Sequence, residues 1–165
     1  MSAVLYTSFD SPIGELLLTG NDHVLRGLHM TEGLRPVRIA PAWQRSEEAF
    51  APVCAQLREY FDGERTRFDV ALDMAGTQFQ RRVWTELETI PYGETISYGE
   101  LARRVGHPSG ARAVGLANGR NPVAVIVPCH RVIGADGSLT GYGGGMERKR
   151  ILLGLEAGEA RLPGL

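Results

Sequence analysis

The sequence has little cysteine and no long apolar run. Two cysteines, Cys54 and Cys129, among 165 residues are too few for a disulfide framework, and they favour a reducing, cytosolic setting. The longest apolar run, residues 123–127, has five residues, far fewer than the ~18 that a membrane helix needs. The first residues show no basic segment followed by an apolar core, so we expect no signal peptide. These absences predict a soluble, cytoplasmic protein.

What the sequence does contain is typical of a folded protein with an uneven charge. With 43% hydrophobic and 22% charged residues it is neither a disordered tail nor a fibrous rod, and its length allows one ordinary domain or two small ones. Residues 1–96 carry nine Arg and fourteen acidic residues, whereas residues 97–150 carry eight basic and three acidic residues. The basic second half suggests an anion-seeking surface, and a solvated face without a partner is the alternative.

The first half is predicted to be a small α+β unit. Alternating apolar residues and turn formers predict strands at residues 4–9, 15–19, 23–30 and 68–72. An apolar stripe over residues 46–61 predicts a helix. Because proline is tolerated in the first turn, Pro52 places the true start of that helix near Ala51. Residues 73–76 form a natural boundary, so we expect domains at residues 1–75 and 76–165.

The second half is predicted to be mostly helical, from capping patterns, helix breakers and periodicity. The expected elements are a helix from residue 77 to Pro91, one opened by the capping pattern of residues 97–100, one from residue 110 to about 118 capped by Ser109, a buried strand at residues 123–127 and a final helix at residues 148–156. The two short helices, separated by the break at residues 106–108, match a helix-turn-helix.

The two cysteines have different contexts. Cys54 lies on an apolar helical face, which indicates packing. Cys129 is followed by His130 and Arg131, two side chains that when cationic lower the pKa of a neighbouring thiol. A cysteine with a nearby histidine and a distant carboxylate is the pattern of an activated thiol, and Glu156 is one candidate for that carboxylate. The alternative is a structural cysteine buried after an apolar strand.

The second helix of the predicted helix-turn-helix has an unusual composition. It consists mostly of alanine and glycine, with Arg112, Asn118 and Arg120 as its polar residues. A helix that reads bases in the major groove presents several long polar side chains, whereas small residues permit close approach to the minor groove, where base information is degenerate. The pattern therefore indicates sequence-independent DNA binding, and tight helix packing is the alternative.

Several motifs together resemble those of one family. Residues 128–131 (PCHR), with 121–123 (NPV) before them and 141–144 (GYGG) after them, resemble the signature of the O6-alkylguanine-DNA alkyltransferases. Residues 11–14 (SPIG) and 91–98 (PYGETISY) resemble the same family, so the similarity covers essentially the whole chain. It implies an α+β fold: a small ribonuclease-H-like N-terminal domain, then a mostly helical winged-helix (helix-turn-helix) C-terminal domain.

The resemblance also implies an activity and a set of catalytic residues. The implied activity is single-turnover transfer of an alkyl group from guanine O6 in DNA, and less well from thymine O4, to Cys129. His130 would deprotonate Cys129 through a water, and Glu156 would orient the imidazole. Asn121 would hold the turn between the recognition helix and the active site, and Tyr98 would donate a proton or hydrogen bond to the flipped base.

The remaining implied residues contact the DNA or the flipped base. Arg112 would fill the gap in the base stack, main-chain groups of Cys129 and Val132 would read the guanine edge, and Tyr142 would line the pocket. The full set of implied contacts is Arg112, Ala111, Gly115, Asn118, Val132, Tyr142 and Gly143; some family members have serine where Gly143 stands, so a hydroxyl is missing here.

The implied partner is double-stranded DNA bearing alkylated guanine, bound by a monomer, with cooperative binding along DNA left open. Zinc-binding family members use clustered cysteine and histidine, and Cys54 has no such companions, so we expect no metal and no cofactor. One competing hypothesis is a non-catalytic binder of alkylated DNA, although such family members carry tryptophan in place of Cys129. Others are a cysteine hydrolase, although adjacent residues rarely point the same way, and a transcriptional regulator, for which the chain lacks an upstream regulatory domain.

Overall fold

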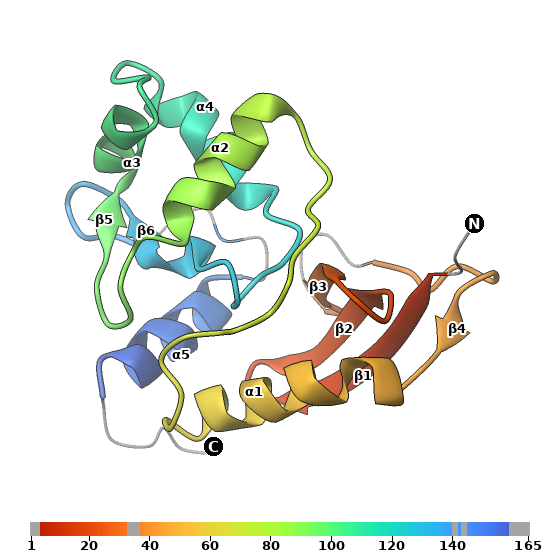
Figure 1. Cartoon of the computed structure of the whole chain (residues 1–165). Coiled ribbons are helices and arrows are strands. Elements are labelled where there is room, and N and C mark those ends of the chain that lie inside the picture. Colours follow the sequence, from red (N-terminus) through yellow and green to blue (C-terminus); the bar gives the residue numbers. More distant parts are fainter. Residues whose placement is uncertain (1–3, 33–36, 140–141, 143–144, 159–165) are drawn as a thin grey trace.

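The computed structural model describes residues 4–32, 37–139, 142 and 145–158 (Figure 1). Its first part is a four-stranded sheet in the order β3-β2-β1-β4, formed by β1 (Leu5–Ser11), β2 (Gly14–Gly20), β3 (Leu25–Met30) and β4 (Gln44–Arg45). The first three strands are antiparallel neighbours, and β4 runs parallel to β1. The tight β1–β2 turn needs Gly14, whose φ is 101°, in the left-handed region that glycine adopts without strain.

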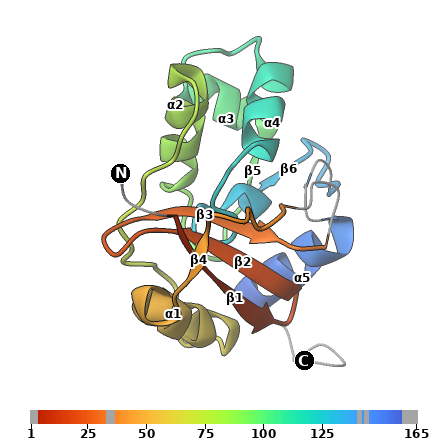
Figure 2. The same ribbon diagram turned by 90° about the vertical axis from the view of Figure 1, so that its right-hand side faces the viewer.

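One helix completes this sheet unit, which comprises β1–β4 and α1. A 3-10 turn (Glu48–Phe50) leads into α1 (Ala51–Phe61), with a proline in its first turn, so the predicted start near Ala51 is confirmed. Figures 1 and 2 show α1 along one face of the sheet. Cys54 packs against the core from this helix, as predicted. Leu57 and Tyr60 are fully buried.

Two predicted strands do not form. Residues 68–72 contribute one bridge, Leu72 to Leu25, and residues 123–127 contribute one, Val123 to Leu28. Both segments touch the edge of β3 at a single residue and then turn away. Val125 has a φ of 72°, which is strained for a β-branched residue, and this turn leads directly to Cys129.

The second part, called the helical unit, runs from α2 to α5. Its elements are α2 (Gln78–Leu87), β5 (Ile96–Ser97), α3 (Tyr98–Arg104), α4 (Ala111–Gly119), a 3-10 turn (Cys129–Arg131), β6 (Val132–Ile133) and α5 (Met146–Glu156). The predicted capping box of α2 is confirmed: the backbone N–H of Gln80 donates to Thr77 Oγ1, and that of Thr77 donates to Gln80 Oε1. Ser109 does not cap α4; the N-cap is Gly110, without a side-chain bond.

The helix-turn-helix pair α3–α4 is fixed from behind by α2. The indole N–H of the buried Trp84 donates to the carbonyl of Ala117 at 2.9 Å, joining α2 to α4. The short parallel pair β5–β6 then places the residue after Arg131 beside the start of α3. The 3-10 turn Cys129–Arg131, called the cysteine turn below, and the helix pair α3–α4 therefore belong to one rigid framework.

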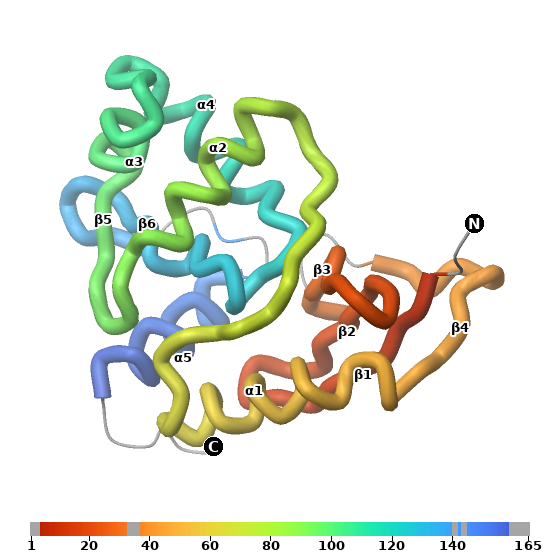
Figure 3. Tube along the Cα trace, in the orientation of Figure 1, coloured from red at the N-terminus to blue at the C-terminus, as the bar shows by residue number. Residues whose placement is uncertain are grey.

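The sheet unit and the helical unit pack into one continuous apolar core. The edge of β3 bonds to the segment before Cys129, through Leu28 N–H to the Pro122 carbonyl and Ala124 N–H to the Leu28 carbonyl. Helix α5 reaches back to the β1–β2 turn, where Arg148 Nε donates to the carbonyl of Ile13 at 2.7 Å. Figure 3 shows the segment between α1 and α2 running along the boundary of the two units. Within the described ranges, no helix is long and apolar enough to cross a membrane.

Candidate active site

Cys129 opens the 3-10 turn and is 5% exposed. Burial raises the pKa of its thiol, while a hydrogen bond from Asn121 and the charge of Lys149 act in the opposite direction. The expectation that His130 and Arg131 lower this pKa is wrong, because both side chains bind Glu156 instead. The thiol is therefore protonated at neutral pH and needs a base before it can act as a nucleophile.

Two asparagines hold the backbone around this thiol. Asn121 donates from Nδ2 to the Val127 carbonyl at 2.7 Å, and its Oδ1 accepts from the Val123 N–H. Asn118 is 1% exposed and donates from Nδ2 to the carbonyl of Cys129 at 3.3 Å. The prediction that Asn118 contacts DNA is wrong, because it lies on the inner face of α4, bound to the cysteine turn.

His130 is completely buried and lies against Glu156, with 2.7 Å between Nε2 and Oε2. Burial lowers the pKa of His130 more than the neighbouring carboxylate raises it, so the imidazole is neutral at neutral pH. Since an ionised carboxylate only accepts hydrogen bonds, Nε2 carries the proton and Nδ1 keeps its lone pair. Among the described residues Nδ1 has no hydrogen-bond partner, which leaves a buried proton acceptor available.

Glu156 is the most heavily bonded side chain of the site. Besides His130, it accepts from Arg131 twice, at 2.7 Å and 2.9 Å, and from the hydroxyl of Tyr60. Burial alone would raise the pKa of Glu156, but the bonds and charges of His130 and Arg131 hold it at about 2. Arg131 also donates to the Ile90 carbonyl and lies over the ring of Tyr92. Sequence reasoning missed Tyr60 and misjudged Arg131, and neither position carries a local signal for these contacts.

Lys149 is a further buried residue that sequence reasoning missed. Its Nζ donates to the Val132 carbonyl at 2.6 Å and lies 5.9 Å from the ring centre of Tyr98. Burial lowers the pKa of Lys149 to about 8, although the charge of Cys129 opposes this. One signal was available, since this is the only lysine in a chain with seventeen arginines. The structure thus brings Tyr98, Val132 and Cys129 around one buried amine.

Of the two pocket residues predicted after Cys129 and Val132, the structure describes Tyr142. Tyr142 is 5% exposed, and burial raises the pKa of its hydroxyl well above 10. Its hydroxyl has no hydrogen-bond partner among the described residues. Gly143 lies outside the described residues.

The outer face of α4 differs sharply from its inner face. Arg112, Ala113, Leu116 and Arg120 are exposed, and Leu116 is 66% exposed. Ala111 and Gly115 are half-buried. A Cβ on Gly115 would lie 3.6 Å from the ring of Tyr98, an ordinary van der Waals distance, so α4 lies close to the start of α3 here and still has room for a methyl group. The face combines positive charge at both ends with small and apolar residues between them.

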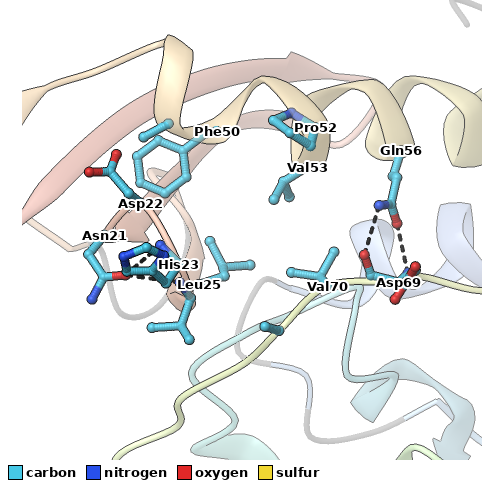
Figure 4. Close-up of a pocket in the computed structure, with 13 residues that line it drawn as sticks. Asn21, Asp22, His23, Leu25, Phe50, Pro52, Val53, Gln56, Asp69 and Val70 are labelled. Atoms are coloured by element: carbon cyan, nitrogen blue, oxygen red, sulfur yellow. Dashed lines mark hydrogen bonds between the residues drawn. The ribbon is translucent and has the colours of Figure 1, made fainter.

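A separate cleft of about 160 Å³ lies in the sheet unit (Figure 4). It is bordered by residues 21–25, the start of α1 and residues 69–71. Gln56 and Asp69 close one end, where the side chain of Gln56 bonds the backbone of Asp69 in both directions. None of the predicted site residues lines it. In the part of the chain that the structure describes, no three His, Cys, Asp or Glu residues gather in a way that would hold a metal.

The fold and the site define a class: a helix-turn-helix unit that carries a buried cysteine followed by a buried, neutral histidine. Comparison with known proteins agrees. The family model of the ribonuclease-like domain of 6-O-methylguanine DNA methyltransferase matches residues 4–74, and that of the DNA binding domain matches residues 78–158. The chain belongs to the O6-methylguanine-DNA methyltransferase family.

Individual relatives are similar over most of their length. Methylated-DNA–protein-cysteine methyltransferases of Mycolicibacterium paratuberculosis and Methanosarcina acetivorans are 58% and 50% identical, each over 92% of this chain and over 91% and 97% of the relative. The crystal structure of the Mycobacterium tuberculosis O6-methylguanine methyltransferase has a TM-score of 0.87 at 56% identity, covering 96% of this chain and 95% of that one. That of Mycobacterium tuberculosis OGT in complex with DNA has a TM-score of 0.87 at 57% identity, covering 93% of each chain. The α+β fold, a ribonuclease-like domain before a helical DNA-binding domain, is confirmed.

Proposed function

We propose that Cys129 receives the alkyl group in this chain, which is a methylated-DNA–protein-cysteine methyltransferase that repairs O6-alkylguanine in DNA. The observation that supports this assignment is the buried thiol of Cys129 next to His130, whose neutral imidazole is held by ionised Glu156. Cys54, the other thiol, has no comparable base and packs against the core.

The reaction begins with the thiol proton. His130 accepts it at Nδ1 through a water, and Glu156 stabilises the imidazolium that forms. The Cys129 sulfur then attacks the alkyl carbon, the bond from that carbon to guanine O6 breaks, and the electron pair stays on the guanine. Tyr98 donates a proton or hydrogen bond to the departing base. The product thioether has no carbonyl for water to attack, so each molecule reacts once.

The substrate is double-stranded DNA that carries the alkylated guanine. Because Cys129 is enclosed, the nucleotide must leave the base stack, at a cost of a few kcal/mol. The outer face of α4 lies in the minor groove, with Ala111 and Gly115 allowing close approach and Arg112 filling the vacated stack. O4-alkylthymine is a poorer substrate in this proposal.

The remaining roles follow from position. Asn121 holds the turn before Cys129, main-chain groups of Cys129 and Val132 contact the guanine edge, and Tyr142 lines the pocket. Gly143 is assigned to that pocket from its place in the sequence alone. We place the domain boundary at residues 75–76. The protein acts as a monomer without a metal or cofactor, in the cytoplasm, where free thiols stay reduced.

The test is the intact mass of the protein after incubation with duplex DNA containing O6-methylguanine. A gain of one methylene is expected, mapped to Cys129 by peptide analysis. Cys129→Ser abolishes the gain, because a serine hydroxyl is far harder to ionise than a thiol, and it keeps DNA binding. The matched control Cys54→Ser retains the gain. Uptake by Cys129→Ser, or its loss in a folded Cys54→Ser protein, would overturn the assignment, and turnover of a thioester or amide would indicate a hydrolase.

A further inference from the structure

The carboxylate of Glu156 has a bonding partner outside the helical unit. Among the described residues, its Oε2 accepts from His130, from Arg131 and from the hydroxyl of Tyr60, whereas Oε1 accepts from Arg131 alone. Tyr60 belongs to α1, ninety-six residues earlier in the chain and part of the sheet unit. The oxygen that holds the imidazole is thus shared with a phenol from the other unit.

The position of Tyr60 is fixed by its neighbours. The side chain is fully buried, and its ring packs edge-on against Phe61 and Tyr92 and at a tilt against Phe68. The hydroxyl of this packed ring donates to Glu156 Oε2. Burial raises the pKa of Tyr60 well above 10, so the phenol stays protonated and acts as a donor. The hydrogen bond is therefore a permanent part of the carboxylate's environment.

We infer that Tyr60 is a positioning residue for alkyl transfer, acting on His130 through Glu156. The inference rests on the proposed role of His130 as the base for Cys129. A third donor on Oε2 draws negative charge away from His130 Nε2–H and fixes the carboxylate plane. The imidazole then stays neutral at neutral pH, with its Nδ1 lone pair ready for the thiol proton. The sheet unit takes part in the chemistry through this contact.

Other charged and titratable groups also act on this pair, and apart from Tyr60 and Tyr92, each replaced in its own variant, they remain unchanged in the test below. The groups facing Glu156 or His130 are Arg131 on the cysteine turn, Lys149 on α5, Tyr92 in the segment after α2, Tyr142 after the cysteine turn and Tyr60 on α1. Of the two hydroxyl deletions compared, only that at Tyr60 changes the number of donors on Oε2.

The experiment compares Tyr60→Phe with Tyr92→Phe. Both variants lose one hydroxyl at the junction of the two units, but the Tyr92 hydroxyl donates to the Leu155 carbonyl at 3.5 Å and not to the carboxylate. The single-turnover rate of methyl transfer from saturating O6-methylguanine duplex is measured from pH 5.5 to 9, with thermal unfolding alongside. The His130 ring pKa is followed by NMR.

In Tyr60→Phe the carboxylate acts more strongly on His130 and raises the pKa of its imidazole. The acid limb of the rate profile, the low-pH range in which His130 becomes protonated and the rate falls, therefore moves upward by about one pH unit. Transfer below the limb is then about tenfold slower than in the unaltered protein, and the rates converge above it. The NMR titration of His130 moves in the same direction, and Tyr92→Phe leaves both unchanged. A uniform slowing at every pH, or equal shifts in the two variants, would overturn the inference.

Should Tyr60→Phe fail to fold, 3-fluorotyrosine incorporated at position 60 keeps the ring and the hydroxyl. Its more acidic O–H is a stronger donor, so the acid limb is expected to move downward. An unchanged limb in this folded variant would also overturn the inference. If the unaltered protein transfers no methyl group to Cys129, the proposed function fails instead, which is a separate outcome.

Discussion

Replacing Glu156 with glutamine probes the buried ion network directly. The folded protein holds the pKa of Glu156 at about 2, against 4.5 for an ordinary glutamate, despite a burial effect in the opposite direction. Each pH unit between these values corresponds to about 1.4 kcal/mol, so the ionised carboxylate stabilises the fold by about 3 kcal/mol. Because the pKa is lowered in the folded state, this stabilisation is complete above pH 4.5 and is lost as the pH falls toward 2.

At neutral pH the Glu156→Gln variant leaves the guanidinium of Arg131 buried without its counter-charge, a change that typically costs about 3–5 kcal/mol. As the pH falls, Glu156 in the unaltered protein becomes protonated and resembles glutamine. The difference in unfolding free energy between the two proteins is therefore expected to shrink by about 2 kcal/mol between pH 5 and pH 3.

Urea denaturation followed by tryptophan fluorescence measures this difference, since Trp84 is buried and reports unfolding. The window below pH 5 lies under the ordinary pKa of histidine, 6.5, which keeps the protonation of His130 in the unfolded chain constant. Glu100→Gln is a suitable control, because that carboxylate pairs with Arg103 and Arg104 on the exposed side of α3. If the difference in unfolding free energy between the two proteins is the same at pH 5 and pH 3, the reasoning is refuted, and Glu156 stabilises the fold through packing and not through its charge.

Three further predictions concern the outer face of α4, which we propose contacts DNA. Arg112→Ala slows transfer from duplex DNA about tenfold if the side chain supplies ~1.4 kcal/mol of support for the flipped state, and it leaves transfer from free O6-benzylguanine unchanged; equal slowing on both would place Arg112 in the chemical step. Leu116→Glu keeps the melting temperature, because the side chain is 66% exposed, but weakens duplex binding at least ~tenfold by facing phosphates with a carboxylate; unchanged affinity in a gel-shift titration would move the DNA to another face. Gly115→Ala has room for its methyl group 3.6 Å from Tyr98 and stabilises α4 by about 0.5–1 kcal/mol in thermal unfolding. Its affinity for duplex DNA falls, and an unchanged affinity would argue against close contact between Gly115 and DNA.

Much of the local structure could be read from the sequence. The Thr77 capping box and the start of α1 near Ala51 depend on side chains within four residues of one another, and the helix-turn-helix lies within one short contiguous segment, so each is visible locally. The distinction between the two thiols was visible in the same way, because Cys54 follows helical periodicity and Cys129 does not.

Predictions failed where residues distant in sequence compete for the same contacts. Residues 68–72 and 123–127 have strand-like composition, but β3 accepts each of them at one residue and the chain then turns. Asn118 looked like a groove-facing amide, yet tertiary packing turns it inward onto the Cys129 carbonyl. Local patterns specify which residues are apolar or polar, and they leave open which surface buries them.

The electrostatics of the site were decided by the tertiary structure alone. From the sequence, His130 and Arg131 are two cations beside a thiol; in the fold, both turn to Glu156, and burial raises the pKa of the Cys129 thiol. The carboxylate lies on a helix twenty-five residues after Arg131, and the phenol of Tyr60 lies on a helix seventy-one residues before it. The sequence by itself determined the family, the helix pair and which cysteine is the candidate nucleophile, because these are written in contiguous residues. Only the fold decided which groups share a proton, since burial and distance exist only once the two units have packed together.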